Sequence, residues 1–384
     1  MIPYSRQFID NDDISSIVKV LKSKLVTQGP LVKKFENKIS NITQSKFATA
    51  VNSATSGLHI ACLALELKKN DYLWTVPNTF VSSANCGRFC GAKIDFVDIN
   101  SETLNICEKE LSKKLIQAKK QKKLPKIVVV VHFGGNPANM FKIKQLSIKF
   151  GFKIIEDASH ALGSKYKKKP IGNCKYSDVA VFSFHPVKPI TTCEGGVVTT
   201  NNLNLKKKMD LFRSHGIVKD PKNFLQNNFD DWKHEQQYLG YNYRMNEIQA
   251  ALGISQLKKL KKFVGQRNKI ALYYKKKLNN KKILFQKILN QNQSSYHLMI
   301  ITLKLNMIKK SYKEIFNYLK KSKIGINLHY YPVHLQPYYQ EHCGKIKMKN
   351  SEKYYKSSFS IPVYYNIKKS DIDFVVKKIN KVIQ

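Results

Sequence analysis

The sequence has little arginine, few acidic residues and no strong regional concentration of charge. Only five of its 67 cationic residues are arginine, the side chain suited to reading phosphates and base edges in bidentate fashion. The 26 acidic residues leave a formal net charge of +41, but the lysines are spread over every region of the chain. We interpret this as a compositional bias on solvated faces and expect no nucleic-acid binding, although an anionic substrate would be attracted.

Long apolar runs and paired cysteines are also missing. No apolar run reaches membrane-spanning length, and the first residues lack the apolar stretch of a signal peptide. The seven cysteines are scattered, odd in number and without CxxC spacing, which favours reduced thiols over a disulfide framework or a zinc site. We therefore expect a cytoplasmic protein with no bound metal and no membrane association.

Apolar strand-like runs alternate with helical stretches through the first half of the chain. The length of 384 residues favours two domains. The alternation predicts an α/β fold, with a large doubly wound, mostly parallel sheet domain over residues 1–250 and a smaller α+β domain over 251–384. In the second domain we expect a long amphipathic helix across residues 248–278 and strands at 284–289, 296–303 and 324–334. Residues 217–237 are polar and predict an insertion.

The most unusual stretch is SFHPVKPITTCEGG, residues 183–196. It follows an apolar strand, and prolines near Lys188 fix the backbone in a conformation that is neither helix nor central strand. A lysine that loses its hydration has a lowered pKa and can act as a Schiff-base nucleophile. Most of the 62 lysines are surface groups, so the residues alone leave a surface role open for Lys188 as well.

Two further segments are suited to binding a charged, planar ligand. Asp157 ends a buried strand, where its carboxylate could pair with a protonated pyridine nitrogen or could cap a helix. The small-residue turn at 53–57 joins a strand to a helix. Its free N–H groups and the helix dipole could bind a phosphate, or the turn could simply begin the helix.

These segments resemble the DegT/DnrJ/EryC1/StrS sugar aminotransferase family, and so do the motifs NSATS (52–56), EDASHALGS (156–164) and GYNYRMNE (240–247). The motifs stand in the same order as in the family, and the resemblance covers nearly the whole chain. The resemblance implies a fold-type-I enzyme that holds pyridoxal 5′-phosphate (PLP) on Lys188. Asp157 would be the second catalytic residue and would bind the pyridine nitrogen. The other implied cofactor contacts are Thr55, Ser56, Phe80, His160, Ser183 and Asn242.

The resemblance assigns a specific place to several of these residues. Phe80 would stack on the pyridine, His160 would lie by the 3-hydroxyl, and Asn242 would reach the phosphate in the partner subunit, giving a homodimer with shared active sites. From the residues alone, Phe80 could equally be a core aromatic. Substrate contacts are implied for Tyr4, Gln28, Arg244, His329 and Tyr330. Without the resemblance, Gln28 reads as part of a helix-ending turn, and the segment at His329 and Tyr330 as an amphipathic edge.

The implied activity is transfer of an amino group from L-glutamate to a nucleotide-linked 4-keto-6-deoxy sugar. Segments at Tyr4 and at residues 25–29 resemble the branch that uses UDP-linked sugars in pseudaminic acid synthesis. Two alternatives stay open. A dehydratase branch of the family carries histidine in place of the lysine; Lys188 argues against it, although His185 lies close by. A lysine-rich nucleic-acid-binding protein is the alternative from a different class.

Overall fold

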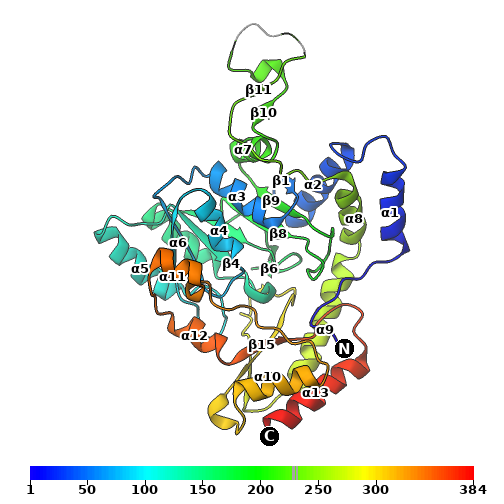
Figure 1. Ribbon diagram of the computed structural model, residues 1–384, viewed down its shortest axis with the longest axis vertical. Helices are drawn as coiled ribbons and strands as arrows, with labels where there is room; N and C mark the ends of the chain where they lie inside the picture. The colour runs from blue at the N-terminus through cyan, green and yellow to red at the C-terminus, as the bar shows by residue number, and fades with distance from the viewer. Residues whose placement is uncertain (227–229, 231) are drawn as a thin grey trace.

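A seven-stranded sheet forms the centre of the protein (Figure 1). The computed structural model describes residues 1–226, 230 and 232–384. The strand order is β1-β9-β8-β5-β4-β2-β3, and β9 runs antiparallel to both of its neighbours while the other strands are parallel to one another. The strands are β1 Phe47–Val51, β2 Tyr72–Thr75, β3 Lys93–Phe96, β4 Ile127–Val131, β5 Lys153–Asp157, β8 Val179–Ser183 and β9 Gly196–Thr200. The predicted α/β class with a mostly parallel sheet is confirmed.

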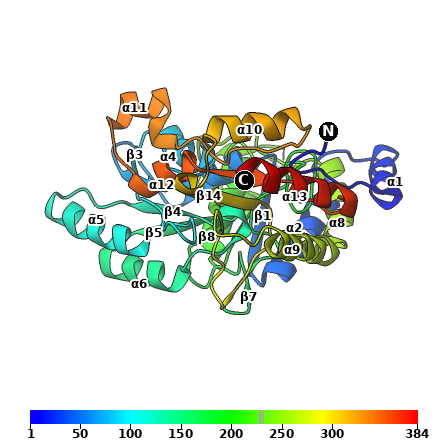
Figure 2. The same ribbon diagram turned by 90° about the horizontal axis from the view of Figure 1, so that it is seen from below.

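Helices cover both faces of this sheet, which explains why its strands, apart from the edge strand β3, are buried along most of their length and not only at alternate residues. One hydrophobic cluster joins Trp74, Val128 and Phe182 to α2 (Pro30–Thr43), α5 (Glu108–Lys120) and α6 (Met140–Phe150). A second cluster, on the opposite face, joins Leu73 and Val129 to α3 (Ala54–Ala64), α4 (Ser82–Phe89) and α7 (Leu203–Arg213). Figure 2 shows α4 and α6 on opposite sides of the sheet.

The C-terminal part of the chain has its own antiparallel sheet, in the order β12-β14-β15. Its strands are β12 Ile283–Phe285, β14 Met299–Leu303 and β15 Ser358–Ile361. A third hydrophobic cluster joins this sheet to α9 (Leu260–Lys277), α10 (Tyr312–Lys321) and α13 (Lys369–Ile383). The N-terminus belongs to the same neighbourhood, because Ile2 forms a bridge with Ile324 and Val363 N donates to Tyr4 O. The division at residue 250 stays a prediction; that residue lies inside α8 (Glu247–Leu257), which packs on α1 (Asn11–Leu21) and α2.

The predictions for the second half of the chain were wrong in three places. The strand expected over 284–289 ends at Phe285, the last residue of β12. The helix expected over 248–278 is interrupted at Lys258 and Lys259, whose backbone N–H groups donate to the carbonyl groups three residues earlier instead of four. Lys259 Nζ also forms an ion pair with Asp13 at 2.9 Å. The strand expected over 324–334 is irregular: Ile324 and Asn327 form isolated bridges, and the segment then ends in a 3₁₀ turn, η4 (Val333–Leu335). The alternation that predicted a strand instead reflects a loop with one side facing a cavity.

The remaining elements are short. Strands β6 (Lys165–Tyr166), β7 (Lys169–Pro170) and β13 (Asn292–Gln293) form a small sheet, and β10 (Ile217–Val218) pairs with β11 (Glu235–Gln236) in a hairpin that projects from the body (Figure 1). The predicted insertion at 217–237 lies partly outside the described residues. Helices α11 (Pro337–Cys343) and α12 (Lys349–Tyr355) precede β15, and short 3₁₀ turns lie at Phe133–Gly135, Pro221–Asn223 and Leu305–Met307. None of the described helices has the length and apolar character needed to cross a membrane.

Candidate active site

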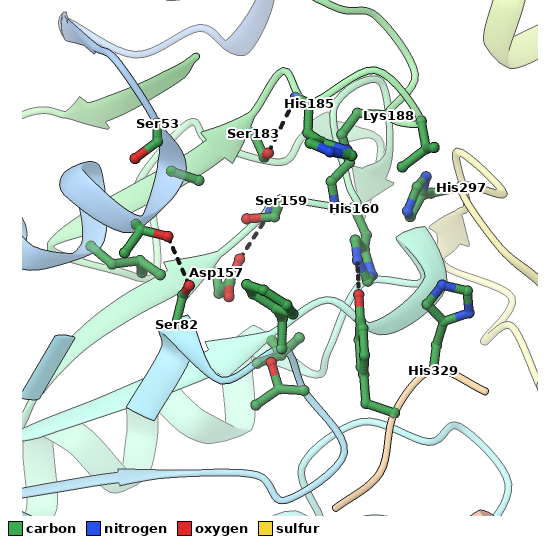
Figure 3. Close-up of a pocket in the computed structure, with 18 of the residues that line it drawn as sticks. Ser53, Ser82, Asp157, Ser159, His160, Ser183, His185, Lys188, His297 and His329 are labelled. Carbon is green, nitrogen blue, oxygen red and sulfur yellow. Dashed lines mark hydrogen bonds between the residues drawn. The ribbon is translucent and has the colours of Figure 1, made fainter. Parts of the chain in front are cut away.

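A cavity of about 500 Å³ opens where β4, β5 and β8 end (Figure 3). Ligands collect at this edge of α/β sheets because the loops after parallel strands meet there. The loops after β1 and β2 and the irregular segment at 327–330 complete its wall. Nine of the residues predicted from the sequence line it: Tyr4, Thr55, Phe80, Asp157, His160, Ser183, Lys188, His329 and Tyr330.

Lys188 lies in a tightly fixed loop between β8 and β9. Its backbone N–H donates to His185 O, and the loop is closed by Phe184, which donates to Gly195 O and accepts from Thr192 N. The Lys188 side chain opens onto the cavity but is otherwise enclosed by protein, and this loss of hydration lowers its pKa to about 8 against the opposing effect of the Asp157 carboxylate. Among the described residues that line the cavity, Lys188 is the one lysine or arginine. Because its pKa is lowered, a much larger fraction of Lys188 is in the neutral amine form near neutral pH than is the case for a surface lysine.

Asp157 is the last residue of β5 and faces the same cavity. Its Oδ1 accepts from Ser159 N at 3.1 Å and its Oδ2 accepts from Ser83 Oγ at 2.6 Å. The side chain is buried, and donors on both oxygens stabilise the charged form. The site thus holds a fixed negative charge across from the amine.

The turn after β1 begins α3 and presents its N-terminus to the cavity. Ser53 is the N-cap and accepts from Ser56 N, while Ser53, Ala54 and Thr55 line the cavity. Ser56 does not line it, because its hydroxyl donates to Asn52 Oδ1 at 2.6 Å inside the turn. Unpaired N–H groups at the start of a helix form a ready site for an anion such as a phosphate.

Aromatic and histidine side chains form the rest of the wall. Phe80 is 56% exposed, which is unusual for a phenylalanine and leaves its ring available to a planar ligand. Gly134 N donates to His160 Nδ1 at 3.3 Å, so the proton of the neutral ring is on Nε2, which donates to Tyr330 Oη at 3.1 Å. Burial and, secondarily, the charge of Lys188 hold the pKa of His160 well below its usual range and lower that of His329 to about 3. Both rings are therefore neutral at physiological pH.

This set of groups fits PLP. The molecule requires an amine for its aldehyde, a carboxylate for its ring nitrogen, an anion site for its phosphate and a flat apolar surface for its ring. The cavity places a low-pKa lysine, Asp157, the start of α3 and an exposed phenylalanine around one space. The roles predicted for the individual residues remain proposals.

Four predicted site residues do not line the cavity: Gln28, Ser56, Asn242 and Arg244. Gln28 is exposed in the turn before α2, Asn242 is exposed, and Arg244 pairs with Val51 through its backbone. Part of the GYNYRMNE motif is structural, since the Glu247 carboxylate accepts from Leu31 N at 2.8 Å and Val32 N at 3.0 Å and so caps α2.

Sequence reasoning did not single out several residues that line the cavity: Ser82, Ser159, Glu194 and His297. Ser53 and Asn327 also line it, and each belongs to a segment that the sequence did indicate. His297 is the most notable, because its ring lies 4.3 Å from that of His160 and its buried Nδ1 has no hydrogen-bond partner among the residues that the structure describes. In the sequence, His297 is recognisable only as a histidine that precedes the apolar run at 298–303. That position does not indicate that its side chain faces the cavity.

Comparison with known proteins agrees with this geometry. A curated Campylobacter jejuni (strain 81-176) protein, UDP-4-amino-4,6-dideoxy-N-acetyl-β-L-altrosamine transaminase, is 40% identical over 376 residues, which cover 98% of this chain and 96% of the relative. The structure is similar to that of Helicobacter pylori PseC, an aminotransferase involved in the biosynthesis of pseudaminic acid, with a TM-score of 0.91, 32% identity and coverage of 100% and 99%. Streptococcus pneumoniae Spr1654 in its PMP-form gives a TM-score of 0.89 at 26% identity, covering 100% and 99%. A family model matches residues 7–380, and the chain belongs to the DegT/DnrJ/EryC1/StrS aminotransferase family.

Proposed function

We propose that the protein is a PLP-dependent aminotransferase that moves an amino group from L-glutamate to a UDP-linked 4-keto-6-deoxy sugar in pseudaminic acid synthesis. The observation that carries this proposal is the cavity in which a low-pKa lysine, a buried carboxylate and a helix N-terminus meet. The names of the Campylobacter and Helicobacter relatives support the choice of sugar and nucleotide.

Each residue of the cavity would have a separate role in this reaction. Lys188 would hold the cofactor through Nζ, Asp157 its ring nitrogen, and Thr55 and Ser183 its phosphate, with Phe80 against the ring. When bound, PLP supplies an electron sink for the charge that develops on the substrate carbon. The ionised carboxylate of Asp157 keeps a proton on the ring nitrogen. Lys188 Nζ, once free, takes up and returns the substrate proton, and a pKa of about 8 suits both directions near neutral pH.

We also propose a homodimer with shared sites. The projecting β10–β11 hairpin carries the exposed apolar side chains Leu225 and Trp232, and Leu239 follows it; all three are more than 75% exposed. Large apolar side chains that are this exposed, and close together in the sequence, favour burial against a partner. Asn242 is exposed just beyond them, where it is free to reach another subunit. The cytoplasmic location and the two-domain division stay predictions.

Borohydride reduction of the purified, PLP-loaded protein tests the proposal. We expect the cofactor to become fixed to the peptide that contains Lys188, and Lys188→Ala to lose the visible absorbance and turnover while remaining folded. The control Lys142→Ala removes an exposed lysine on α6 and should retain both. Trapping on another lysine would contradict the assignment, and assays with UDP- and dTDP-linked keto sugars then determine the substrate.

A further inference from the structure

A short chain of buried hydroxyl groups lies behind the Asp157 carboxylate. Ser83, on α4, donates from Oγ to Asp157 Oδ2 at 2.6 Å, and Thr79 Oγ1 lies 2.8 Å from Ser83 Oγ. Ser83 is fully buried and does not line the cavity, whereas Thr79 lies at its edge. Ser83 thus approaches the carboxylate from the side away from the ligand space.

The direction of these hydrogen bonds follows from the number of protons. An ionised carboxylate can only accept, so the single hydroxyl proton of Ser83 is committed to Asp157. Ser83 must then accept at its own oxygen, and Thr79 is the donor of the second bond. The order Thr79 to Ser83 to Asp157 stabilises the ionised carboxylate, and each bond strengthens the next.

The second carboxylate oxygen is held as well. Asp157 Oδ1 accepts from Ser159 N at 3.1 Å, so the carboxylate is fixed through both oxygens. The charged and titratable groups that act on it are Lys188 and Tyr330, both of which line the cavity. Neither donates a hydrogen bond to Asp157, which leaves Ser83 as its side-chain donor in the described structure.

We propose that Ser83 is a positioning residue that keeps Asp157 ionised and oriented toward the cofactor nitrogen, with Thr79 reinforcing it. This inference rests on the proposed function. Loss of the Ser83 donor makes the carboxylate more basic, so the proton shared between carboxylate and ring nitrogen moves toward Asp157. The ring then accepts electrons less well.

The test is NMR of the wild-type and variant proteins loaded with PLP labelled with ¹⁵N in the ring. For Ser83→Ala we expect the ring ¹⁵N resonance near neutral pH to move toward its unprotonated position, by an amount that corresponds to about a tenfold change in the distribution of the proton, the scale of one hydrogen bond to a charged group. The value of kcat should fall about tenfold with little change in KM, because the effect lies on the chemical step. Ser83→Thr, which keeps the hydroxyl, should restore the wild-type ¹⁵N shift.

Two further variants keep the inference testable if Ser83→Ala folds poorly. Thr79→Val removes only the second donor, so we expect a smaller ¹⁵N change in the same direction. Ser147→Ala is the matched control, because Ser147 is a buried serine on α6 whose hydroxyl donates to Phe152 O at 2.6 Å, away from the cavity.

Equal ring ¹⁵N shifts at the same pH in wild type, Ser83→Ala, Thr79→Val and the Ser147→Ala control would overturn the inference and leave the proposed function standing. A wild-type protein that takes up no PLP would instead overturn the proposed function and the inference with it.

Discussion

Replacing Asp157 by asparagine tests how the two charged groups of the cavity act on each other. Burial lowers the pKa of Lys188 to about 8, and the charge of the Asp157 carboxylate acts in the opposite direction by raising that pKa. Asparagine has nearly the same shape but no charge, so the pKa of Lys188 in the cofactor-free variant should fall below 8. A change of one pH unit corresponds to about 1.4 kcal/mol of interaction between the two groups.

The pH dependence of Lys188 acylation in cofactor-free protein measures this pKa, because only the neutral amine reacts. We expect a midpoint near 8 in the wild type and a lower midpoint in Asp157→Asn. Asp95→Asn is the matched control, since Asp95 pairs with Lys114 at 2.6 Å outside the cavity, and its midpoint should match the wild type. In the PLP-loaded protein, Asp157→Asn should lower kcat by at least about 100-fold. An unchanged or raised midpoint would refute the reasoning.

Two other predictions concern assembly and stability. Co-expression of Lys188→Ala with Asn242→Asp should restore activity to about a quarter of all sites. Random mixing makes about half the dimers mixed, and each mixed dimer has one intact site out of two. If dimers shown to be mixed recover no activity, Asn242 belongs to the site of its own subunit. Glu247→Gln should lower the free energy of unfolding by about 1–3 kcal/mol, because an amide NH₂ cannot accept from both Leu31 N and Val32 N; thermal denaturation measures it, and an unchanged melting temperature would contradict the capping role.

The sequence predicted the features that local pattern determines. The apolar runs located the central strands, and the proline-flanked Lys188 and the strand-ending Asp157 are found where the pattern indicated. Interactions between distant segments could not be predicted in this way. Ser83 meets Asp157 across 74 positions of the chain, and His297 reaches the cavity from the second half of the molecule. The segment that carries His329 has the alternation of a strand, but it pairs with the rest of the described structure through isolated bridges, Ile324 with Ile2 and Asn327 with Ser360.

The antiparallel placement of β9 has a consequence for how the enzyme moves. Because β8 and β9 are neighbours and pair as far as Ser183 and Gly196, the Lys188 loop leaves and re-enters the sheet at adjacent points. Phe184 extends this anchoring into the loop through its hydrogen bonds with Gly195 and Thr192. We therefore expect the backbone near Lys188 to move little, so that the reach of the amine is set mainly by the four methylene groups of its own side chain. Amide hydrogen exchange should be slow at Phe184 and Thr192, whether or not a ligand is bound.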